Sequence, residues 1–440
     1  MVDYSYLTIQ NPWWDNPQSV NQDEKLVEFE SSKFKYLPQE ILNLKLRPGD
    51  INIITGPRQT GKSTSIKLYI RQLLKNSFPA GSILFFNCDA LSSQKDLTNL
   101  VMEFVSRDEK KETCIFLDEV TSVDSWPQGI KWLADSGLLK RSAVFLTGSS
   151  SINLKKHGEF LPGRRGKGID IAFLPITFAD YLSLHGIKDI DQNFKTSGKI
   201  KDHFEKYSLS GGLLRNINYG PKANISLYLA TLRSELFKSG KKEDSLREVV
   251  RKLLSSLSTQ TSYTNIAEEA ELGSKNTAID YLSFLSDSYF LKETKFYEIS
   301  QQRVILKKNK KYYAVDPYFI WMFSAFVYGE EGFGSYPERY NLPAEKGKLV
   351  ENFIASELVK SKTEFYYFQN SRELDFILPR KRLAIEVKYK DKITSEDLKS
   401  LEAVPAGYKK ILVSKNTTDK RGNIHIIPAH LAAVSPLWPK

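Results

Sequence analysis

The stretch that decides the fold runs from Ile51 to Asn76 and reads INIITGPRQTGKSTSIKLYIRQLLKN. Its first five residues, INIIT, form an apolar, β-prone run that predicts a buried strand. After a glycine-bearing turn, the next residues predict a helix whose apolar side chains share one face, at Ile66, Tyr69, Ile70, Leu73 and Leu74. A strand, a tight turn and a helix in this order predict the first unit of a parallel α/β sheet.

The turn itself, GPRQTGKS at Gly56–Ser63, fits the pattern G-x-x-x-x-G-K-S/T in the strand-to-helix context that this motif requires. Glycines let backbone amides point at phosphate oxygens, and the start of the helix adds the positive end of its dipole. We expect Lys62 to reach the β- and γ-phosphates and Ser63 to bind Mg²⁺. The expected nucleotide contacts are Gly56, Pro57, Arg58, Gln59, Thr60, Gly61, Lys62, Ser63, Thr64 and, from a later strand, Ser149. The sequence therefore predicts a site for ATP and Mg²⁺.

Four more apolar runs predict the other strands of the sheet, at Ser82–Cys88, Cys114–Asp118, Ala143–Thr147 and Ile169–Leu174. Each run is typical of a strand that is buried on both faces, and helical patterns separate the runs, so we expect three layers. In CIFLDEV, two carboxylates follow an apolar run at the carboxyl end of its strand, where open α/β sheets place their sites. We expect Asp118 to hold Mg²⁺ and Glu119 to activate the attacking water as a base. The alternative for Glu119 is a helix-start carboxylate without a catalytic role.

Two later motifs add candidates for the same site. FLTGSS ends a strand with hydroxyl groups at Thr147, Ser149 and Ser150, and Ser149 or Ser150 is expected to contact the γ-phosphate or the water. An ordinary turn of Ser and Gly is the alternative. LPGRRGKG carries Arg164 and Arg165, and an arginine here can stabilise transition-state charge in its own chain or in a neighbouring one. Action on a neighbour would require a homo-oligomer, and a basic surface turn is the alternative.

The rest of the chain changes pattern twice. It is helical from Pro175 to about Leu236; three short helices and a hairpin-like pair of strands then predict a winged helix. The last part has its own order of a helix, three strands, a helix and a strand, so the fold class is α/β and multidomain. The predicted segments are 1–45 at the N-terminus, 46–175 as the ATPase core, 176–240 as a helical lid, 241–328 as the winged helix, 329–344 as a linker and 345–440 as the C-terminal domain.

The stretch ELDFILPRKRLAIEVKYK at Glu373–Lys390 carries charges inside predicted strands. Residues two apart share a face of a strand, so Glu386 and Lys388 lie together, and Asp375 on the preceding strand can lie across from Glu386. Two facing carboxylates repel each other unless a divalent cation lies between them, and a neighbouring ammonium group can orient water or offset phosphate charge. The pattern predicts a phosphodiesterase site that uses Mg²⁺ or Mn²⁺. The alternative is a half-exposed strand face with alternating charges.

Composition bounds the partners of the chain. The net charge of the 440 residues is +11, and the residues from Lys346 onward hold 18 Lys and Arg against 11 Asp and Glu. Locally basic surface favours a polyanion, and we expect nucleic acid, with DNA as the natural partner of a winged helix. Two cysteines fit a reducing interior. The first residues lack a signal-peptide pattern, and the longest apolar run is about half of the ~20 residues of a membrane span, so we expect a cytoplasmic protein without a membrane partner.

The motifs GPRQTGKST, CIFLDEV, FLTGSS, GRRG and FLPITFADYL, in this order, resemble the AAA-type ATPases of archaea and bacteria that carry an uncharacterised C-terminal domain. The resemblance implies a RecA-like or AAA+-like core with an extra strand between the phosphate-loop strand and the Asp118 strand. It also implies a helical lid, a winged helix and a C-terminal domain with the restriction-endonuclease-like fold. The segment SGGLLRN at Ser210–Asn216 departs from the Gly-Gly-x-Pro often found in the family.

The spacing D-x10-E-x-K also resembles the PD-(D/E)xK nuclease signature, and Glu351 on the preceding helix matches a further acidic position. That resemblance implies metal ligation by Glu351, Asp375 and Glu386. Two functions follow. One is a Mg²⁺-dependent ATPase that acts on DNA, with a C-terminal domain that cleaves or binds it. The alternative is a nucleotide-dependent switch or signalling ATPase whose C-terminal domain is an inactive binding module.

Overall fold

The computed structural model describes residues 4–108, 111–148, 163–188, 194–329, 342–435 and 438. The chain forms two compact units, Met1–Leu174 and Pro175–Lys440. The division into six segments is finer than these units and stays a prediction. The predicted phosphate contact Ser149, its alternative Ser150 and residues 330–341 of the predicted linker lie outside the described residues.

The first unit is built on a parallel sheet of five strands, as the apolar runs predict. The strands are β1 (Ile51–Thr55), β2 (Ile83–Asn87), β3 (Thr113–Asp118), β4 (Ser142–Gly148) and β5 (Asp170–Ala172). Their order is β2-β3-β4-β1-β5, so β4 lies between the strand that precedes the phosphate-binding turn and the strand that ends at Asp118. This order confirms the strand insertion that the family resemblance implies.

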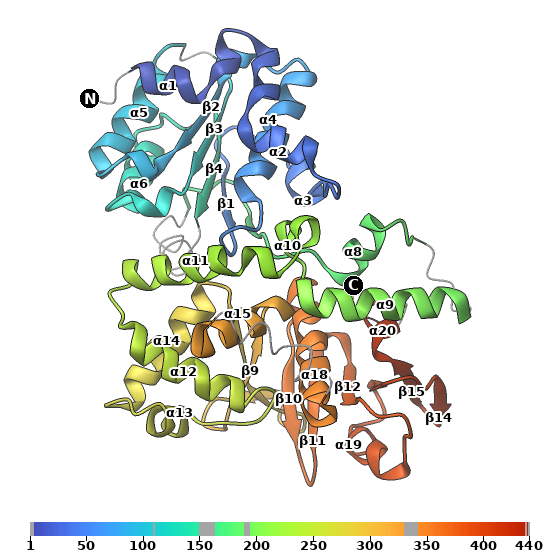
Figure 1. The fold of residues 1–440 in the computed structure, drawn as a ribbon. Helices are drawn as coiled ribbons and strands as arrows, with labels where there is room; N and C mark the ends of the chain where they lie inside the picture. Colours follow the sequence, from blue (N-terminus) through green and yellow to red (C-terminus); the bar gives the residue numbers. More distant parts are fainter. Residues whose placement is uncertain are drawn as a thin grey trace. The chain divides into compact units, whose positions relative to one another are not determined.

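Helices cover both faces of this sheet and bury it (Figure 1). Helix α4 (Lys62–Lys75) packs on one face, where Ile66 and Tyr69 join a buried apolar cluster. On the other face, α5 (Gln94–Val105) and α6 (Trp126–Asp135) contribute side chains such as Leu97, Leu100 and Ile130 to a second cluster. Strands that are apolar on both faces need such double cover, so the predicted three layers are confirmed.

The residues before the sheet pack partly against its edge strand β2 and partly against α4. They form α1 (Tyr4–Gln10), η1 (Pro12–Trp14), η2 (Pro17–Gln22), α2 (Glu24–Ser31) and α3 (Gln39–Leu42). The side chain of Asn11 donates to the carbonyl oxygen of Phe85 at 2.8 Å and accepts from its amide at 2.6 Å. The indoles of Trp13 and Trp14 both donate to the carbonyl oxygen of Ile83. These side chains satisfy edge groups that would otherwise offer a pairing site.

The second unit begins with helices. They are α8 (Phe178–Leu184), α9 (Phe194–Ser210), α10 (Leu214–Tyr219), α11 (Ile225–Lys238), α12 (Glu243–Ser255), α13 (Tyr263–Glu269), α14 (Lys275–Asp287) and α15 (Pro317–Tyr328). The longest apolar run of the sequence is α15, which is a buried core helix. Within the described residues, no helix combines the length and the apolar character that crossing a membrane requires.

The two strand runs after α14 do not form the simple hairpin that the sequence predicts. Strand β6 (Leu291–Thr294) does pair with β9 (Lys311–Ala314). However, β7 (Phe296–Glu298) leaves this pair and bonds to β8 (Arg303–Ile305) on one side and to a C-terminal strand on the other. The rings of Phe296 and Tyr297 stack on those of Phe368 and Tyr366, and this distant apolar contact outweighs continuation of the local hairpin.

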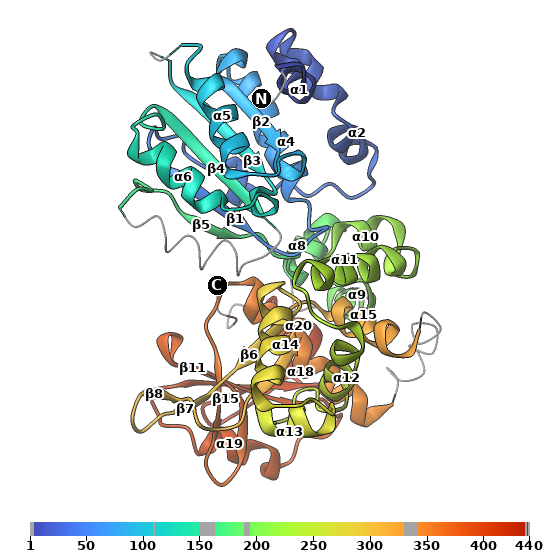
Figure 2. The same cartoon turned by 90° about the vertical axis from the view of Figure 1, so that its left-hand side faces the viewer.

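The C-terminal part contains the predicted elements in the predicted order. They are α18 (Pro343–Lys360), β10 (Tyr366–Gln369), β11 (Glu373–Leu378), β12 (Leu383–Lys388), η8 (Ser395–Leu398), α19 (Lys399–Glu402) and β13 (Lys409–Ser414). The sequence analysis missed β14 (Asp419–Arg421), β15 (Ile424–Pro428) and α20 (Ala429–Ala432). Together with β7 and β8, the strands form one mixed sheet in the order β14-β15-β13-β12-β11-β10-β7-β8. Figure 2 labels β7, β8, β11 and β15 of this sheet.

A buried ionic network ties the helices of the second unit together. The ammonium group of Lys360 lies 2.7 Å from a carboxylate oxygen of Asp316 and donates to the hydroxyl of Tyr207 at 2.6 Å. Asp316 also accepts from the amide of Gly212 at 2.8 Å. A Cβ on Gly211 would lie 1.7 Å from the same carboxylate. The glycines of SGGLLRN therefore let the chain approach Asp316 closely.

Candidate nucleotide site and acidic cluster

Backbone geometry explains the glycines of the turn between β1 and α4. A Cβ on Gly56 would lie 2.0 Å from the carbonyl oxygen of Phe173, which follows the neighbouring strand β5. Gly61 is left-handed, with a φ of 97°, and caps α4 without a side-chain hydrogen bond. The first amides of a helix have no intrahelical partner, so those after Gly61 can bind an anion. The turn therefore places backbone donors at a helix start, which is where proteins commonly bind anions.

The side chains of the turn complete this picture. The ammonium group of Lys62 is buried and donates to the carbonyl oxygens of Gly56 and Pro57 at 2.8 and 2.9 Å. Ser63 and Thr64, at the start of α4, are partly exposed, and the contacts of all three side chains with a nucleotide stay predictions.

The acidic pair at the end of β3 is organised by a threonine of β4. The hydroxyl of Thr147 donates to a carboxylate oxygen of Asp118 at 2.5 Å and accepts from the amide of Glu119 at 2.9 Å. This contact arises because β3 and β4 are paired up to Leu117 and Leu146. Asp118 is 4% exposed. The sequence offers Thr147 only as a hydroxyl near the phosphate, whereas in the structure this hydroxyl contacts the carboxylate of Asp118 and the backbone of Glu119.

Glu119 has an unusual backbone conformation and a carboxyl group with a raised pKa. Its φ of 52° is rare for a residue with a side chain, and such backbone strain is common at functional sites. Burial raises the pKa of its carboxyl group, and the charges of Lys62 and Arg58 oppose this rise. Because β1 and β3 are parallel strands of one sheet, the acidic pair and the phosphate-binding turn both follow strand ends at the same edge of that sheet. A raised pKa favours a carboxylate that takes a proton near neutral pH.

The two arginines of the GRRG turn do not lie beside the phosphate-binding turn. Arg164 pairs with Asp135, the last residue of α6, and Arg165 donates to the carbonyl oxygen of Ile51 at 3.1 Å and pairs with Asp170. Ile51 begins β1, whereas the phosphate-binding turn follows the other end of that strand. The structure therefore does not bring Arg164 and Arg165 to the phosphate-binding turn of their own chain. Their action on a neighbouring chain stays a prediction.

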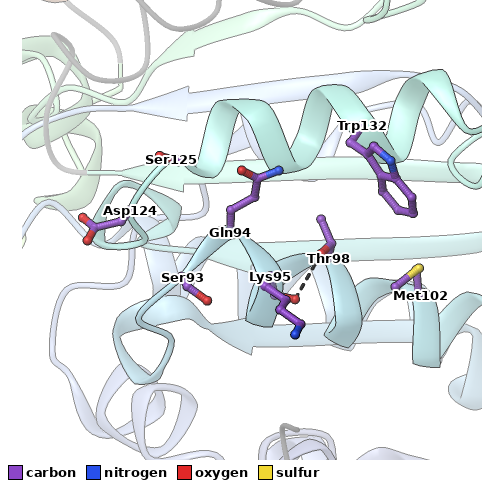
Figure 3. Close-up of a pocket in the computed structure, with 8 residues that line it drawn as sticks. All are labelled: Ser93, Gln94, Lys95, Thr98, Met102, Asp124, Ser125 and Trp132. Carbon is purple, nitrogen blue, oxygen red and sulfur yellow. Dashed lines mark hydrogen bonds between the residues drawn. The ribbon is translucent and has the colours of Figure 1, made fainter.

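A surface pocket of about 530 Å³ lies between α5 and α6 (Figure 3). Its lining residues are Ser93, Gln94, Lys95, Thr98, Met102, Asp124, Ser125 and Trp132. None of these residues belongs to the predicted sites, and the pocket has a polar rim beside the half-exposed ring of Trp132. It is separate from the turn that precedes α4.

In the second unit, the structure gathers the four predicted residues of the C-terminal domain. A carboxylate oxygen of Asp375 on β11 accepts from the amide of Val387 at 2.9 Å, and one of Glu386 on β12 accepts from the amide of Asp375 at 3.3 Å. Asp375 and Glu386 are 6% and 1% exposed. Lys388 forms an ion pair with Glu386. The two carboxylates thus face each other across adjacent strands, and Glu351 approaches from α18.

A lysine that the sequence analysis missed lies among these carboxylates. Lys311 comes from β9, and its side chain is fully buried. Its ammonium group lies 2.7 Å from Glu351, 2.8 Å from Glu373 and 3.2 Å from Asp375. The hydroxyl of Tyr313 donates to the same oxygen of Glu351 at 2.8 Å. The only signal in the sequence is a lysine within the β-prone run KKYYAVD, and nothing local links it to carboxylates 40 to 64 residues later.

This acidic cluster, which we define as Glu351, Glu373, Asp375 and Glu386, does not fit a metal ion as it stands. Burial raises the pKa of Glu351 to about 8, and Asp375 adds to the rise. Burial and Asp375 likewise raise the pKa of Glu386 to about 8, against the effect of Lys388. Among the described residues, no group of three or more His, Cys, Asp or Glu side chains is arranged to hold a metal ion. The ammonium groups of Lys311 and Lys388 pair with the members of the cluster instead.

Three family models match parts of the chain. An AAA domain matches residues 49–182, and two domains of unknown function, DUF8612 and DUF4143, match residues 222–320 and 346–432. An uncharacterized protein of Methanocaldococcus jannaschii is 23% identical over 450 residues, which cover 90% of this chain and 91% of that protein. An uncharacterized protein of Haemophilus influenzae is 22% identical over 382 residues, covering 83% and 88% of the two chains.

Solved structures with some similarity include three AAA+ proteins. Cdc6p of Pyrobaculum aerophilum is 14% identical with a TM-score of 0.26, covering 66% of this chain and 90% of that one. Orc1 of Aeropyrum pernix, solved in complex with DNA, is 15% identical with a TM-score of 0.27, covering 74% and 97%. RuvB of Thermotoga maritima is 12% identical with a TM-score of 0.27, covering 66% and 92%. The model of an AAA domain thus matches the segment that holds the phosphate-binding turn, Asp118 and Glu119.

Proposed function

We propose that the chain is a Mg²⁺-dependent ATPase whose reaction takes place between the phosphate-binding turn and the end of β3. The observation that carries this proposal is the hydroxyl of Thr147, which holds Asp118 and the backbone of Glu119 in one arrangement. In water the carboxylate of Asp118 would reorient freely, whereas here its orientation is fixed before the substrate arrives.

Each residue then has a defined task. The amides after Gly61 and the ammonium group of Lys62 bind the phosphates. Ser63 and Asp118 would hold Mg²⁺, which neutralises phosphate charge when it is bound. Glu119 orients a water molecule and takes its proton. The other residues of the turn, Pro57, Arg58, Gln59, Thr60 and Thr64, keep their predicted contacts with the nucleotide, and Ser149 stays a predicted contact outside the described residues.

The test is phosphate release by the full-length protein with ATP and Mg²⁺. We expect turnover in the wild type, with a loss of about 100-fold or more in Lys62→Ala, which removes phosphate binding, and in Glu119→Gln, which removes the base. Glu119→Gln should still bind a fluorescent ATP analogue, whereas Lys62→Ala should bind it weakly. Turnover that survives both substitutions would place the activity elsewhere.

We also propose that the second unit acts on nucleic acid, with DNA as the expected form. The C-terminal helix and strands follow the order of the restriction-endonuclease-like fold, and they carry the excess of basic residues from Lys346 onward. The predicted winged-helix segment supplies β7 and β8 to the same sheet, which makes one basic body of the two predicted domains. Its second helix, α13, ends in two glutamates, so contact is expected mainly from the C-terminal part.

Fluorescence anisotropy with labelled duplex and single-stranded DNA tests this part. Affinity should fall steeply between ~50 and ~200 mM salt, because binding to a polyanion releases counterions. RNA of the same sequence distinguishes the two nucleic acids. An affinity below detection for DNA and RNA at low salt would sink this part of the proposal and leave the ATPase proposal intact.

A nucleotide-dependent switch with an inactive C-terminal module is the second candidate, and the ion pairs of Lys311 favour it. Two measurements separate the candidates. A DNA-processing enzyme turns ATP over quickly and cleaves or remodels DNA with Mg²⁺ or Mn²⁺. A switch hydrolyses ATP slowly, and its cleavage does not exceed that of Lys388→Ala.

A further inference from the structure

The ammonium group of Lys311 lies where the sequence pattern predicts a divalent cation. Its three neighbours come from two different elements: Glu351 from α18, and Glu373 and Asp375 from β11. A lysine ammonium group has three hydrogens to donate, and these three carboxylates use all of them. The positive charge that two facing carboxylates need is therefore supplied by the chain itself.

The position of the Lys311 ammonium group makes a metal ion unfavourable at the oxygens that this group contacts. Lys311 pairs with three members of the acidic cluster, and Lys388 pairs with the fourth, Glu386. A divalent cation bound to the same oxygens would lie next to the ammonium group of Lys311. Repulsion between like charges a few ångströms apart is strong in a site that excludes water.

Lys311 is also held firmly in place. Its strand pairs with β6, with Lys311 opposite Thr294. Ala314 lies three residues after Lys311 on this strand. The side chain of Asn352 accepts from the amide of Ala314 at 2.7 Å and donates to its carbonyl oxygen at 3.2 Å. Asn352 is fully buried and follows Glu351 on α18. Withdrawal of the lysine would leave buried carboxylates without a counter-charge and would break these contacts.

We propose that Lys311 permanently replaces the divalent cation, and that the C-terminal domain engages its polyanionic partner without hydrolysing it. The statement about the partner rests on the proposed function, whereas the statement about the metal ion stands on the ion pairs of Lys311 alone. The predicted ligands Glu351, Asp375 and Glu386 then have a structural task. Glu351 and Asp375, together with Glu373, bind the predicted winged-helix segment to the C-terminal part through the buried Lys311, and Glu386 pairs with Lys388.

The test is Mn²⁺ binding, measured by electron paramagnetic resonance on the full-length protein. A Lys62→Ala background without nucleotide lowers binding at the ATP site, and Asp375→Asn in the same background reports any Mn²⁺ that the acidic cluster holds. Lys311→Met removes the charge but keeps the length of the side chain. Lys310→Met is the matched control, because the ammonium group of Lys310 donates to the carbonyl oxygens of Leu306 and Lys308 instead of to the cluster.

We expect no Mn²⁺ that depends on Asp375 in the background protein or in Lys310→Met. Lys311→Met should gain about one Mn²⁺ per chain, and Asp375→Asn should remove it. A Lys311→Met protein that binds no Mn²⁺ would overturn the claim that this lysine excludes the metal ion. If Lys311→Met does not fold, the background protein decides the question, because Mn²⁺ binding there that depends on Asp375 overturns the proposal and its absence supports it.

DNA binding and cleavage are measured on the same samples. With Mn²⁺, the wild type should cleave DNA no faster than Lys388→Ala or Asp375→Asn. Cleavage that these two substitutions abolish would overturn the proposal even if DNA binding is normal. A wild type that binds no DNA, and no Mn²⁺ that depends on Asp375, would instead refute the proposed action on nucleic acid and leave the role of Lys311 intact.

Discussion

Replacement of Thr147 by valine tests the ATP site most selectively, because it changes one hydroxyl group and keeps the shape of the side chain. That hydroxyl makes a hydrogen bond to the buried carboxylate of Asp118 and accepts one from the amide of Glu119. A hydrogen bond to a charged group contributes about 1.5–3 kcal/mol. If the loss falls on the transition state, kcat falls by about 10- to 100-fold. The expected effect is on kcat, because Thr147 positions the acidic pair and does not bind the nucleotide.

Steady-state phosphate release over a range of ATP concentrations measures this effect. We expect Thr147→Val to lower kcat by about 10- to 100-fold and to change the KM for ATP by less than about 3-fold. Thr147→Ser keeps the hydroxyl group and should retain kcat within about 5-fold. A Thr147→Val protein that is folded and keeps kcat within about 2-fold would refute the reasoning, as would a serine variant that loses as much as the valine variant.

Three further predictions have measurable outcomes. The kcat of the wild type should fall as the pH falls through a midpoint above 4.5, because the pKa of Glu119 is raised and its carboxylate is protonated below that pKa. Stopped-flow phosphate release between pH 5 and 8 measures this, and an unchanged rate would show that Glu119 is not the base. Arg165→Ala should cost about 1 kcal/mol of unfolding free energy in urea titrations, more than Arg164→Ala, because the guanidinium group of Arg165 also bonds to the backbone of β1. A large loss of ATPase activity in either variant that grows at high protein concentration would instead indicate action on a neighbouring chain. Lys360→Met should cost about 3–5 kcal/mol in the same titrations, because Asp316 would be left buried without its cation; a loss below about 1 kcal/mol would contradict that role.

Much of the first unit can be predicted from the sequence because its signals are local. A strand buried on both faces has a continuous apolar run, and the turn at Gly56–Ser63 has a motif whose chemistry depends on adjacent residues. Asp118 and Glu119 follow from their place after such a run. The role of Thr147 does not, because it depends on which strand lies beside β3.

The second unit is less predictable because its decisive contacts join distant segments. The pairing of β7 with β10 depends on rings that are about 70 residues apart in the chain, at Phe296 and Phe368. The pattern at Asp375, Glu386 and Lys388 correctly placed these residues together, yet it could not show the lysine that arrives from β9. A sequence motif specifies the groups that could bind a metal ion, and the tertiary fold decides whether another charge already lies there.

The most direct test of the central claim is phosphate release from ATP by the full-length protein, compared with that of Glu119→Gln at matched protein and Mg²⁺ concentrations. The arrangement around Thr147 predicts multiple turnovers in the wild type and a loss of about 100-fold or more in Glu119→Gln, with nucleotide binding retained. Equal rates in the two proteins, or no turnover in a folded wild type that binds ATP, with or without DNA, would contradict the assignment of this site as an ATPase.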